Sequence, residues 1–345
     1  MPGNRTLATG PGGPPEVQVA TVRVRAAGPD EALAFLARLE ADDGVPPVDE
    51  DEQRRLAGLT PIRDGDWWWG GHLAVVDDAP VAYAGTRLAP DGHVGGTADC
   101  AARVDLAFDR RHPAAQQALR AALDDARAHA VRAGATPACD ERPVEAWLRG
   151  ATDDDLATAA QAGFTVKGRL HVMGATVEEI ASVDPDASGA APDIDVAGHV
   201  PDGLRLRTFD QDAPADADAV VALLSAAYPQ LHGWYGSGFA VLRATDWFRP
   251  EDLLMLESET DGALLGIHWM KRRGDGVGEV YNLALAAEAQ GRGLGRLLLD
   301  AGLAHLAAVG SREVILWVDA DNPPALALYR SRGFTPRWDD VSLVG

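Results

Sequence analysis

Three features are scarce in this sequence, and each scarcity excludes a class of protein. Two cysteines among 345 residues are too few for a disulfide framework and match no metal-ligand spacing. No apolar run is long enough to span a bilayer, and the first residues contain no apolar segment of an export signal. Basic residues number 31 against 52 acidic ones, a formal net charge of −21. We therefore expect a cytoplasmic protein that binds neither nucleic acid nor membrane.

The residues that are present indicate a globular protein of two domains. Hydrophobic residues make up 46% of the chain and charged residues 24%, and the length exceeds that of one ordinary domain. A stretch rich in Asp, Pro, Ala and Gly, without apolar periodicity, separates two halves of similar length. We divide the chain into a disordered N-terminus (1–17), a first domain (18–182), a linker (183–200) and a second domain (201–345).

Both halves show the same order of expected elements, as diverged copies of one α/β unit would. In the second half we expect strands at 253–257, 264–272, 279–285 and 313–318, helices at 292–309 and 323–332, and a last strand after Phe334. In the first half we expect strands at 73–76, 81–86 and 104–108, helices at 113–132 and 156–162, and a last strand after Phe164. In each half the second helix ends at Gly-Phe, typical of a helix that hands over to a strand. Alternating strands and helices predict a mixed sheet layered with helices.

The segment from Gln290 to Gly295 carries the strongest chemical signal. An apolar strand runs into Gln-Gly-Arg-Gly-Leu-Gly, and a helix follows at once. Glycines let backbone N–H groups approach a ligand, and the unpaired N–H groups of a first helical turn attract anions. With Arg292 as a fixed positive charge, the segment predicts a pyrophosphate cradle. Taken alone, the pattern is also compatible with a turn that only links strand to helix.

A second motif gives the glycine loop its context. Further along the chain, Asp321-Asn-Pro-Pro-Ala-Leu-Ala-Leu-Tyr329 leads to Gly333-Phe334. The combination resembles the GNAT acetyltransferases, which have a Q/R-x-x-G-x-G/A loop and then N-x-x-A-x-x-x-Y-x-x-x-G-F. The resemblance implies two tandem GNAT domains, acetyl-CoA as co-substrate and no metal. It assigns acetyl-CoA contacts to Leu283, Ala284, Leu285, Gln290, Gly291, Arg292, Gly293, Leu294, Gly295 and Asn322.

Two residues are candidates for proton transfer. An α-amino group titrates near 8, so it is mostly the ammonium at neutral pH and needs a base before it attacks a thioester. Glu279, at the start of the strand that leads to the cradle, is our candidate base, with a solvated strand-end carboxylate as the alternative. Tyr329 falls on the tyrosine of the GNAT pattern, which implies a general acid for the leaving thiolate. A core aromatic with a satisfied hydroxyl is the alternative there.

The first half lacks the cradle. At the equivalent place it reads Phe108-Asp-Arg-Arg-His-Pro113, without glycine, and proline has no N–H to offer at the helix start. Arg110 and Arg111 remain, most simply as solvated turn residues. We therefore expect one acetyl-CoA site per chain, in the second half, and a degenerate first domain.

Several segments from both halves resemble a narrower family, the mycothiol synthases, which are tandem-GNAT enzymes. The shared pieces include Asp43 to Glu50, Gly266 to Lys271, Gly278 to Tyr281 and Val318 to Asn322. The resemblance implies acetylation of the cysteinyl amine of cysteinyl-glucosaminyl-inositol. It implies acceptor contacts from Glu50, Gln230, Lys271, Glu279 and Trp317. Gln230 stands where the family has Glu, Met270 where it has Thr, and Leu343 where it has an aromatic, and we expect these departures to lie around the acceptor.

Two other functions are open from the sequence. One is a tandem GNAT enzyme that acetylates a different small amine, such as an antibiotic or an amino sugar, and Gln230 favours it. The other is a non-catalytic CoA-binding module, which the intact cradle, Glu279 and Tyr329 disfavour. We expect a monomer whose partners are acetyl-CoA and a small-molecule amine.

Overall fold

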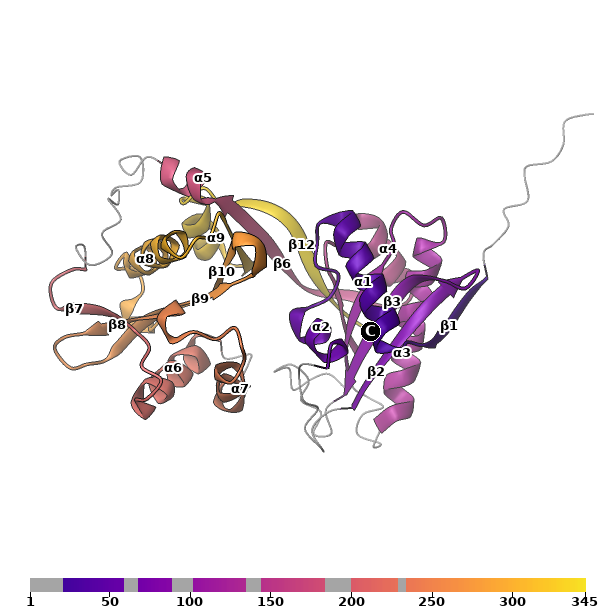
Figure 1. Ribbon diagram of the computed structural model, residues 1–345, viewed down its shortest axis with the longest axis horizontal. Coiled ribbons are helices and arrows are strands. Elements are labelled where there is room, and N and C mark those ends of the chain that lie inside the picture. Colours follow the sequence, from indigo (N-terminus) through magenta and orange to yellow (C-terminus); the bar gives the residue numbers. More distant parts are fainter. Residues whose placement is uncertain (1–20, 59–67, 89–101, 135–143, 184–199, 229–233) are drawn as a thin grey trace, which may run out of the picture.

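In the computed structural model the two halves share a single sheet of twelve strands (Figure 1). The structure describes residues 21–58, 68–88, 102–134, 144–183, 200–228 and 234–345. The expected disordered N-terminus and nearly all of the expected linker lie outside these residues. No helix in the described part of the chain is long and apolar enough to cross a membrane.

The first half contains the expected elements and five more that the sequence did not lead us to expect. Its elements are β1 (Val22–Ala26), α1 (Pro29–Asp43), α2 (Glu50–Leu56), β2 (Trp68–Val76), β3 (Ala79–Leu88), β4 (Ala102–Phe108), α3 (Ala115–Gly134), β5 (Val144–Leu148), α4 (Asp153–Gln161) and β6 (Thr165–Thr176), followed by α5 (Val177–Ser182). The five unexpected elements are β1, α1, α2, β5 and α5. Thr152 caps α4 in a capping box that closes with Asp155, which is why this helix starts where it does.

The second half confirms the expected strands and helices to within a few residues. Its elements are β7 (Leu204–Thr208), α6 (Pro214–Ala227), α7 (Trp234–Arg243), η2 (Pro250–Asp252), β8 (Leu253–Ser258), β9 (Leu264–Arg272), η3 (Gly274–Gly276), β10 (Val277–Leu285), η4 (Ala287–Ala289), α8 (Leu294–Ala308), β11 (Glu313–Asp319), α9 (Pro323–Arg330) and β12 (Thr335–Val344). The sequence did not lead us to expect β7, α6 or α7, so the two helices that cover one face of the second half's sheet were missed.

The last strand of each half is inserted beside the other half's strands. The sheet order is β1-β2-β3-β4-β5-β12-β6-β11-β10-β9-β8-β7. Thus β12 lies between β5 and β6, and β6 lies between β12 and β11. Figure 1 shows β6 and β12 running side by side between the two halves. Packing accounts for this exchange: Val341 and Leu343 of β12 belong to the core of the first half, whereas Met173 and Ala175 of β6 belong to that of the second.

The sheet of the second half has a different helical layer on each face. Met270 packs under α8 and α9, in a cluster with Leu299 and Leu326, whereas Trp269 packs with Phe239 on the face covered by α6 and α7. Neighbouring residues of a strand project to opposite faces, so Lys271 shares the α6–α7 face with Trp269. This face carries the charged residues described below.

A buried histidine fixes the distance between α8 and β9. Nδ1 of His268 lies 2.7 Å from the Leu298 carbonyl oxygen, and a Cβ atom at Gly302 would lie 2.0 Å from Nδ1. Only glycine therefore fits at residue 302 while the imidazole is in place. Burial lowers the pKa of His268 to about 4, so the ring is neutral at pH 7.

Candidate active site

Three charged side chains gather on the α6–α7 face of the β9–β10 hairpin. Glu279 and Lys271 are each 5% exposed and stand directly opposite each other in the antiparallel ladder, so their side chains share a face. Nε of Arg273 donates a hydrogen bond of 2.7 Å to Oε2 of Glu279. Glu279 is therefore a buried, hydrogen-bonded carboxylate and not a solvated one at a strand end.

Strand β10 separates from β11 after Val280, the residue that follows Glu279. The parallel pairing covers Val277–Val280 only, whereas β10 stays paired with β9 as far as Leu285. A register shift at Tyr281 adds a bulge, which bends the strand at this point. Along residues 281–285, one edge of β10 has no strand partner among the described residues. The Leu283 carbonyl accepts a long hydrogen bond of 3.4 Å from the Tyr228 hydroxyl, and the other backbone groups of this edge remain for a ligand.

The glycine segment after β10 has the conformation of an anion cradle. Gly291 and Gly293 have φ angles of 72° and 79°, in the left-handed region that favours glycine. Gly293 is the N-cap of α8. The amides of residues 291–295 have no backbone acceptor among the described residues, and those of Arg296 and Leu297 both donate to the Gly293 carbonyl. The preceding N–H groups and the positive end of the α8 dipole thus face the same space. Gln290 and Arg292 are exposed there, while the Leu294 side chain is buried behind it.

Tyr329 and Asn322 both lie on α9. The Asn322 side chain accepts a hydrogen bond of 3.2 Å from the Ala325 N–H, so it is the N-cap of this helix. Tyr329 is 7% exposed and packs edge-on against Phe334. Burial, with a smaller contribution from Tyr228, raises the pKa of Tyr329 above its usual value, so the phenol keeps its proton at neutral pH. Its hydroxyl has no hydrogen-bond partner in the described part of the chain.

Aromatic rings surround the Lys271 ammonium. Nζ lies 4.3 Å from the Trp247 ring centroid and 5.7 Å from that of Tyr281. These two rings contact each other and the buried Trp269, with centroid distances of 5.1 Å between Trp247 and Tyr281 and 4.9 Å between Trp269 and Tyr281. Cation–π contacts with desolvated rings are worth about 2 kcal/mol. The rings therefore hold Lys271 in place beside Glu279.

Trp317 connects this site to the first half of the chain. Its indole N–H donates a hydrogen bond of 2.7 Å to Oδ2 of Asp340 on β12. Asp340 is 1% exposed and also accepts bonds from the Arg149 side chain at 2.5 Å and the Gly150 N–H at 3.2 Å, both just beyond β5. The guanidinium of Arg273 lies over the Trp317 ring, 5.1 Å from its centroid. The inserted strand β12 thus joins the two halves beside Glu279.

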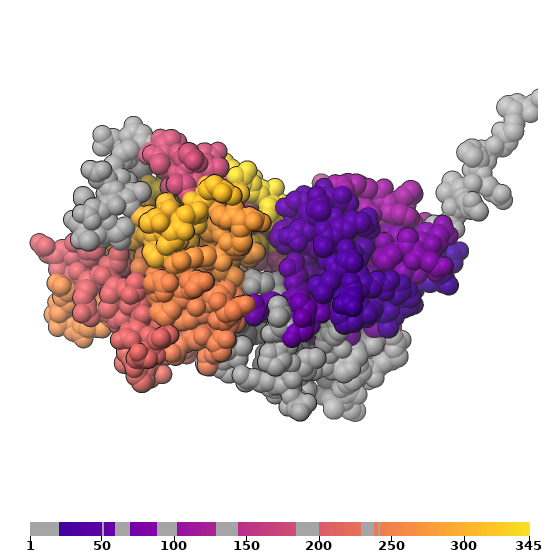
Figure 2. Space-filling model, viewed as in Figure 1, coloured from indigo at the N-terminus to yellow at the C-terminus, as the bar shows by residue number. Residues whose placement is uncertain are grey.

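Helix α2 of the first half begins with Glu50 and contacts the second half. Burial alone would raise the pKa of its N-cap, Asp49, but Arg87 and Arg103 outweigh it and hold that pKa below the usual range. Asp49 accepts hydrogen bonds from these two arginines and from the Glu52 N–H at 2.7 to 2.9 Å. Further along α2, Arg54 pairs at 2.9 Å with Asp246, the residue before Trp247. Figure 2 shows the two halves abutting on one face.

The side chains of the predicted acceptor residues Glu50 and Gln230 lie outside the described part of the chain. The backbone of Glu50 is described, at the start of α2, but its side chain is not. Gln230 lies outside the described residues. The other predicted site residues, from Lys271 to Tyr329, all lie on β9, β10, β11, α8 and α9 or in the loops between them.

The expectation that Met270 and Leu343 lie around the acceptor is wrong. The Met270 side chain, 1% exposed, packs under α8 on the face opposite Lys271. Leu343, also 1% exposed, packs in the first-half core with Ala146, its neighbour in the β5–β12 ladder. Both departures from the family pattern therefore lie in the hydrophobic core.

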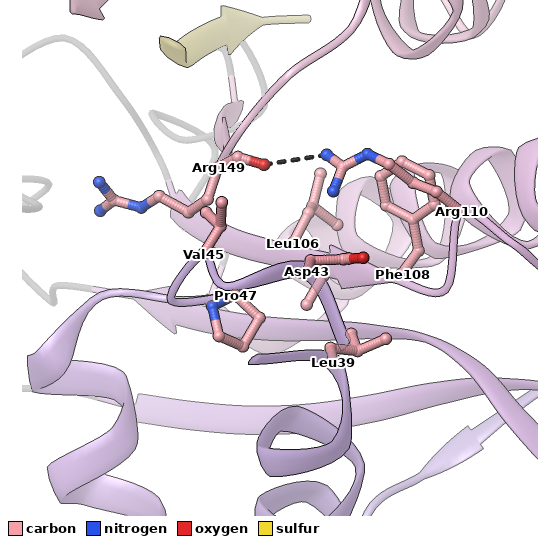
Figure 3. Close-up of a pocket in the computed structure, with 9 residues that line it drawn as sticks. Leu39, Asp43, Val45, Pro47, Leu106, Phe108, Arg110 and Arg149 are labelled. Atoms are coloured by element: carbon pink, nitrogen blue, oxygen red, sulfur yellow. Dashed lines mark hydrogen bonds between the residues drawn. The ribbon is translucent and has the colours of Figure 1, made fainter. Parts of the chain in front are cut away.

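At the equivalent place in the first half there is a pocket whose Arg110 is bonded to other residues of the same half. A pocket at the end of β4 is lined by Leu39, Asp43, Val45, Pro47, Leu106, Ala107, Phe108, Arg110 and Arg149 (Figure 3). Arg110 donates to the Arg149 carbonyl at 2.9 Å and to Asp155 at 3.0 Å, and its guanidinium lies 4.6 Å from the Phe108 ring centroid. Arg111 pairs with Asp43. Arg111, whose side chain is 56% exposed, is the solvated turn residue that we expected, whereas Arg110 is half-buried and paired with the buried Asp155, which favours a structural role for this loop.

The sequence reading assigned no role to Arg273, Asp340, Arg149 or Trp247. Strand periodicity contained a signal for Arg273, which lies two residues beyond Lys271 and therefore on the same face. No local pattern contained one for Asp340 or Arg149, because their contact depends on the insertion of β12 beside β5.

Comparisons with known proteins agree with this geometry. Residues 217–334 match the model of the Acetyltransferase (GNAT) family. The chain is 32% identical to the mycothiol acetyltransferase of Geodermatophilus obscurus, over 93% of this chain and 95% of that one. It is 36% identical to the mycothiol acetyltransferase of Clavibacter michiganensis, over 88% and 87% of the two chains.

Two solved structures share the fold over nearly the full length. A GCN5-related N-acetyltransferase from Sphaerobacter thermophilus is 21% identical, with a TM-score of 0.62 over 94% of this chain and 95% of that one. A tandem GNAT protein from the clavulanic acid biosynthesis pathway is 19% identical, with a TM-score of 0.63 over 94% and 98%. The chain belongs to the mycothiol acetyltransferase family, and it consists of two tandem GNAT units.

Proposed function

We propose that this N-acetyltransferase transfers the acetyl group of acetyl-CoA to the cysteinyl amine of cysteinyl-glucosaminyl-inositol, which yields mycothiol and CoA. The observation that carries the proposal is the arrangement along β10. A buried carboxylate, Glu279, lies near one end, an unpaired strand edge follows, and the glycine cradle comes directly after the other end. Catalysis belongs to residues 201–345, and the first domain supplies part of the acceptor site.

The cradle and the free strand edge fit acetyl-CoA. The unpaired N–H groups before Arg296 and the start of α8 suit the pyrophosphate, with Arg292 at hand as a cation. The unpaired edge at Leu283, Ala284 and Leu285 suits the amides of the pantetheine arm, since buried polar groups need partners. A backbone N–H of this edge also stabilises the negative charge that develops on the acetyl oxygen.

Glu279 and Tyr329 carry the proton transfers. Oε1 of Glu279 takes a proton from the substrate ammonium, and the freed nitrogen lone pair forms a bond to the acetyl carbonyl carbon. As the tetrahedral arrangement collapses, the carbonyl re-forms and the C–S bond breaks with its electron pair staying on sulfur. The nitrogen gives up its remaining excess proton, to the leaving thiolate by way of Tyr329 or to water, which leaves a neutral amide. The protonated Tyr329 hydroxyl donates a hydrogen bond or its proton to that thiolate. A base of this kind contributes roughly 10²–10⁴ in rate.

The acceptor lies between the two halves in this proposal. From the second half, Lys271 and Trp317 contact it, with Lys271 fixed by Trp247 and Tyr281. From the first half, the contact comes from the start of α2, where Glu50 is the residue that we assign to the acceptor. Gln230 completes the set; as a neutral amide it accepts a hydrogen bond but forms no ion pair. We expect Gln230→Glu to tighten acceptor binding for that reason.

The decisive experiment offers the purified protein acetyl-CoA together with cysteinyl-glucosaminyl-inositol. A parallel panel contains aminoglycosides, amino sugars and free amino acids. Because the acceptor itself carries a thiol, thiol reagents cannot report CoA release here, and loss of the thioester absorbance is the better signal. Mass spectrometry then identifies the product. We expect acetylation on nitrogen, so the product's thiol still reacts with an alkylating reagent.

Each outcome has a defined meaning. Turnover of the thiol conjugate well above that of the panel supports the proposal. An inert conjugate beside another amine that turns over leaves the acetyltransferase and contradicts the acceptor. Binding of acetyl-CoA without turnover of any amine points to the non-catalytic module.

A further inference from the structure

We propose that Arg273 is a positioning residue for Glu279, holding one carboxylate oxygen so that the other faces the substrate amine. The inference rests on the proposed function, because it takes Glu279 as the base. Arg273 belongs to neither the acetyl-CoA cradle nor the acceptor residues named above.

The first step is the contact itself. Arg273 follows β9 directly and is joined to Glu279 across the short η3 turn, with its Nε atom 2.7 Å from Oε2. Glu279 is 5% exposed, and the Arg273 side chain is 28% exposed. A charge-assisted bond to a buried carboxylate is among the stronger hydrogen bonds in proteins. Oε2 is therefore fixed.

The second step concerns the other oxygen. No described residue donates a hydrogen bond to Oε1 of Glu279. This oxygen is also not one of the fully buried side-chain atoms that lack a hydrogen-bond partner, so it is accessible from outside. The side chain thus has one oxygen bound to the protein and one oxygen open. A carboxylate held in this way presents its free lone pairs in one direction, which is the requirement for a general base in a near-attack arrangement.

The third step explains why arginine itself stays in place. Its guanidinium lies over the Trp317 ring, and Trp317 is fixed by the bond of its indole N–H to the buried Asp340. Asp340 is in turn held by Arg149 beyond β5. A continuous series of contacts therefore runs from Arg149 and Asp340 through Trp317 and Arg273 to Glu279, so the position of the base depends on the packing of the first half.

The chemistry of the stack favours arginine over lysine. A planar guanidinium donates to a carboxylate in its plane and at the same time stacks on an aromatic face, whereas an ammonium is a point charge on a flexible stem. We therefore expect Arg273→Lys to restore part of the contact with Glu279 but not the stacking on Trp317.

The test compares Arg273→Ala, Arg273→Lys and Glu279→Gln in the full-length protein. We expect Arg273→Ala to lower kcat roughly 10- to 100-fold, because a misplaced catalytic group costs up to about 10²-fold. The KM for acetyl-CoA should stay within about twofold, since the cradle is untouched. Arg273→Lys should recover part of kcat. Guanidinium at millimolar concentrations should raise the rate of Arg273→Ala and leave the wild type unchanged.

A double mutant separates positioning from a general effect on the fold. Residues that act as a unit are not additive, so adding Arg273→Ala to Glu279→Gln should slow the enzyme by no more than about twofold. Arg205→Ala, which removes the same charge from the 60% exposed Arg205 side chain on β7, is the matched control and should leave kcat unchanged.

The results that overturn the inference differ from those that overturn the proposed function. If Glu279→Gln is slow while Arg273→Ala turns over at the wild-type rate, Glu279 stays the base and the positioning role is refuted. Additive losses in the double mutant, or no response to guanidinium, refute it as well. If Glu279→Gln itself keeps the wild-type rate, the assignment of the base fails instead.

Discussion

Replacing Glu279 by glutamine removes the carboxylate and keeps the shape of the side chain. The amide oxygen can still accept the 2.7 Å bond from Arg273, so the buried site should keep its packing. The proton acceptor is lost, because an amide does not take up a proton near neutral pH. Acetyl-CoA binding should stay the same, since the cradle lies beyond the other end of β10.

The size and pH dependence of the effect follow from the substrate amine. General-base catalysis is worth roughly 10²–10⁴, so Glu279→Gln should lower kcat at pH 7 by about 10²-fold or more. With a pKa near 8, about one-tenth of an α-amino group is neutral at pH 7 and nearly all of it is neutral at pH 9. The variant should therefore gain about tenfold in rate over that interval, while the wild type gains less.

The assay is kcat at saturating concentrations of both substrates from pH 6.5 to 9.5, followed by loss of the thioester absorbance. Glu259→Gln is the matched control, because Glu259 is exposed in the turn between β8 and β9 and the same charge is removed. A variant that keeps the wild-type rate at every pH, or whose deficit does not change with pH, would refute the reasoning.

Four further outcomes are expected. Glu50→Ala should raise the acceptor KM about tenfold or more, because it removes one charge-assisted hydrogen bond to the acceptor, without changing the KM for acetyl-CoA. Calorimetric titration should give one acetyl-CoA per chain, and Gly293→Trp should abolish binding, because a bulky side chain at a φ of 79° distorts the cradle. Asp340→Ala should lower the free energy of unfolding in urea by about 3–5 kcal/mol, since it leaves Arg149 unpaired, and Asp340→Asn by less. Burial lowers the pKa of His268 to about 4 in the folded protein from about 6.5 for an exposed imidazole, so the unfolded state binds the proton first and stability should fall as the pH drops from 6.5 to 4. His268→Gln should show a shallower fall in the same denaturation series.

The sequence alone determined the parts of the site that depend on local chemistry. Glycines at 291 and 293 indicated a cradle because they let backbone N–H groups approach a ligand, and in the structure both have the positive φ angles that favour glycine. Periodicity located α8 and gave the bounds of β9, Leu264 to Arg272, as the structure has them. Each of these features is decided within a few residues of the chain.

Only the tertiary structure decided which strand lies beside which. Both halves end in a strand after the same Gly-Phe signal, so local patterns cannot tell whether β12 belongs next to β5 or next to β11. The choice depends on the fit of Val341 and Leu343 into one core and of Met173 and Ala175 into the other. That exchange brings Asp340 of β12 into contact with Arg149 and Trp317, which lie 191 and 23 residues away from it in the sequence. Contacts between such distant residues arise from the burial of two cores at once, and no spacing along the chain encodes them.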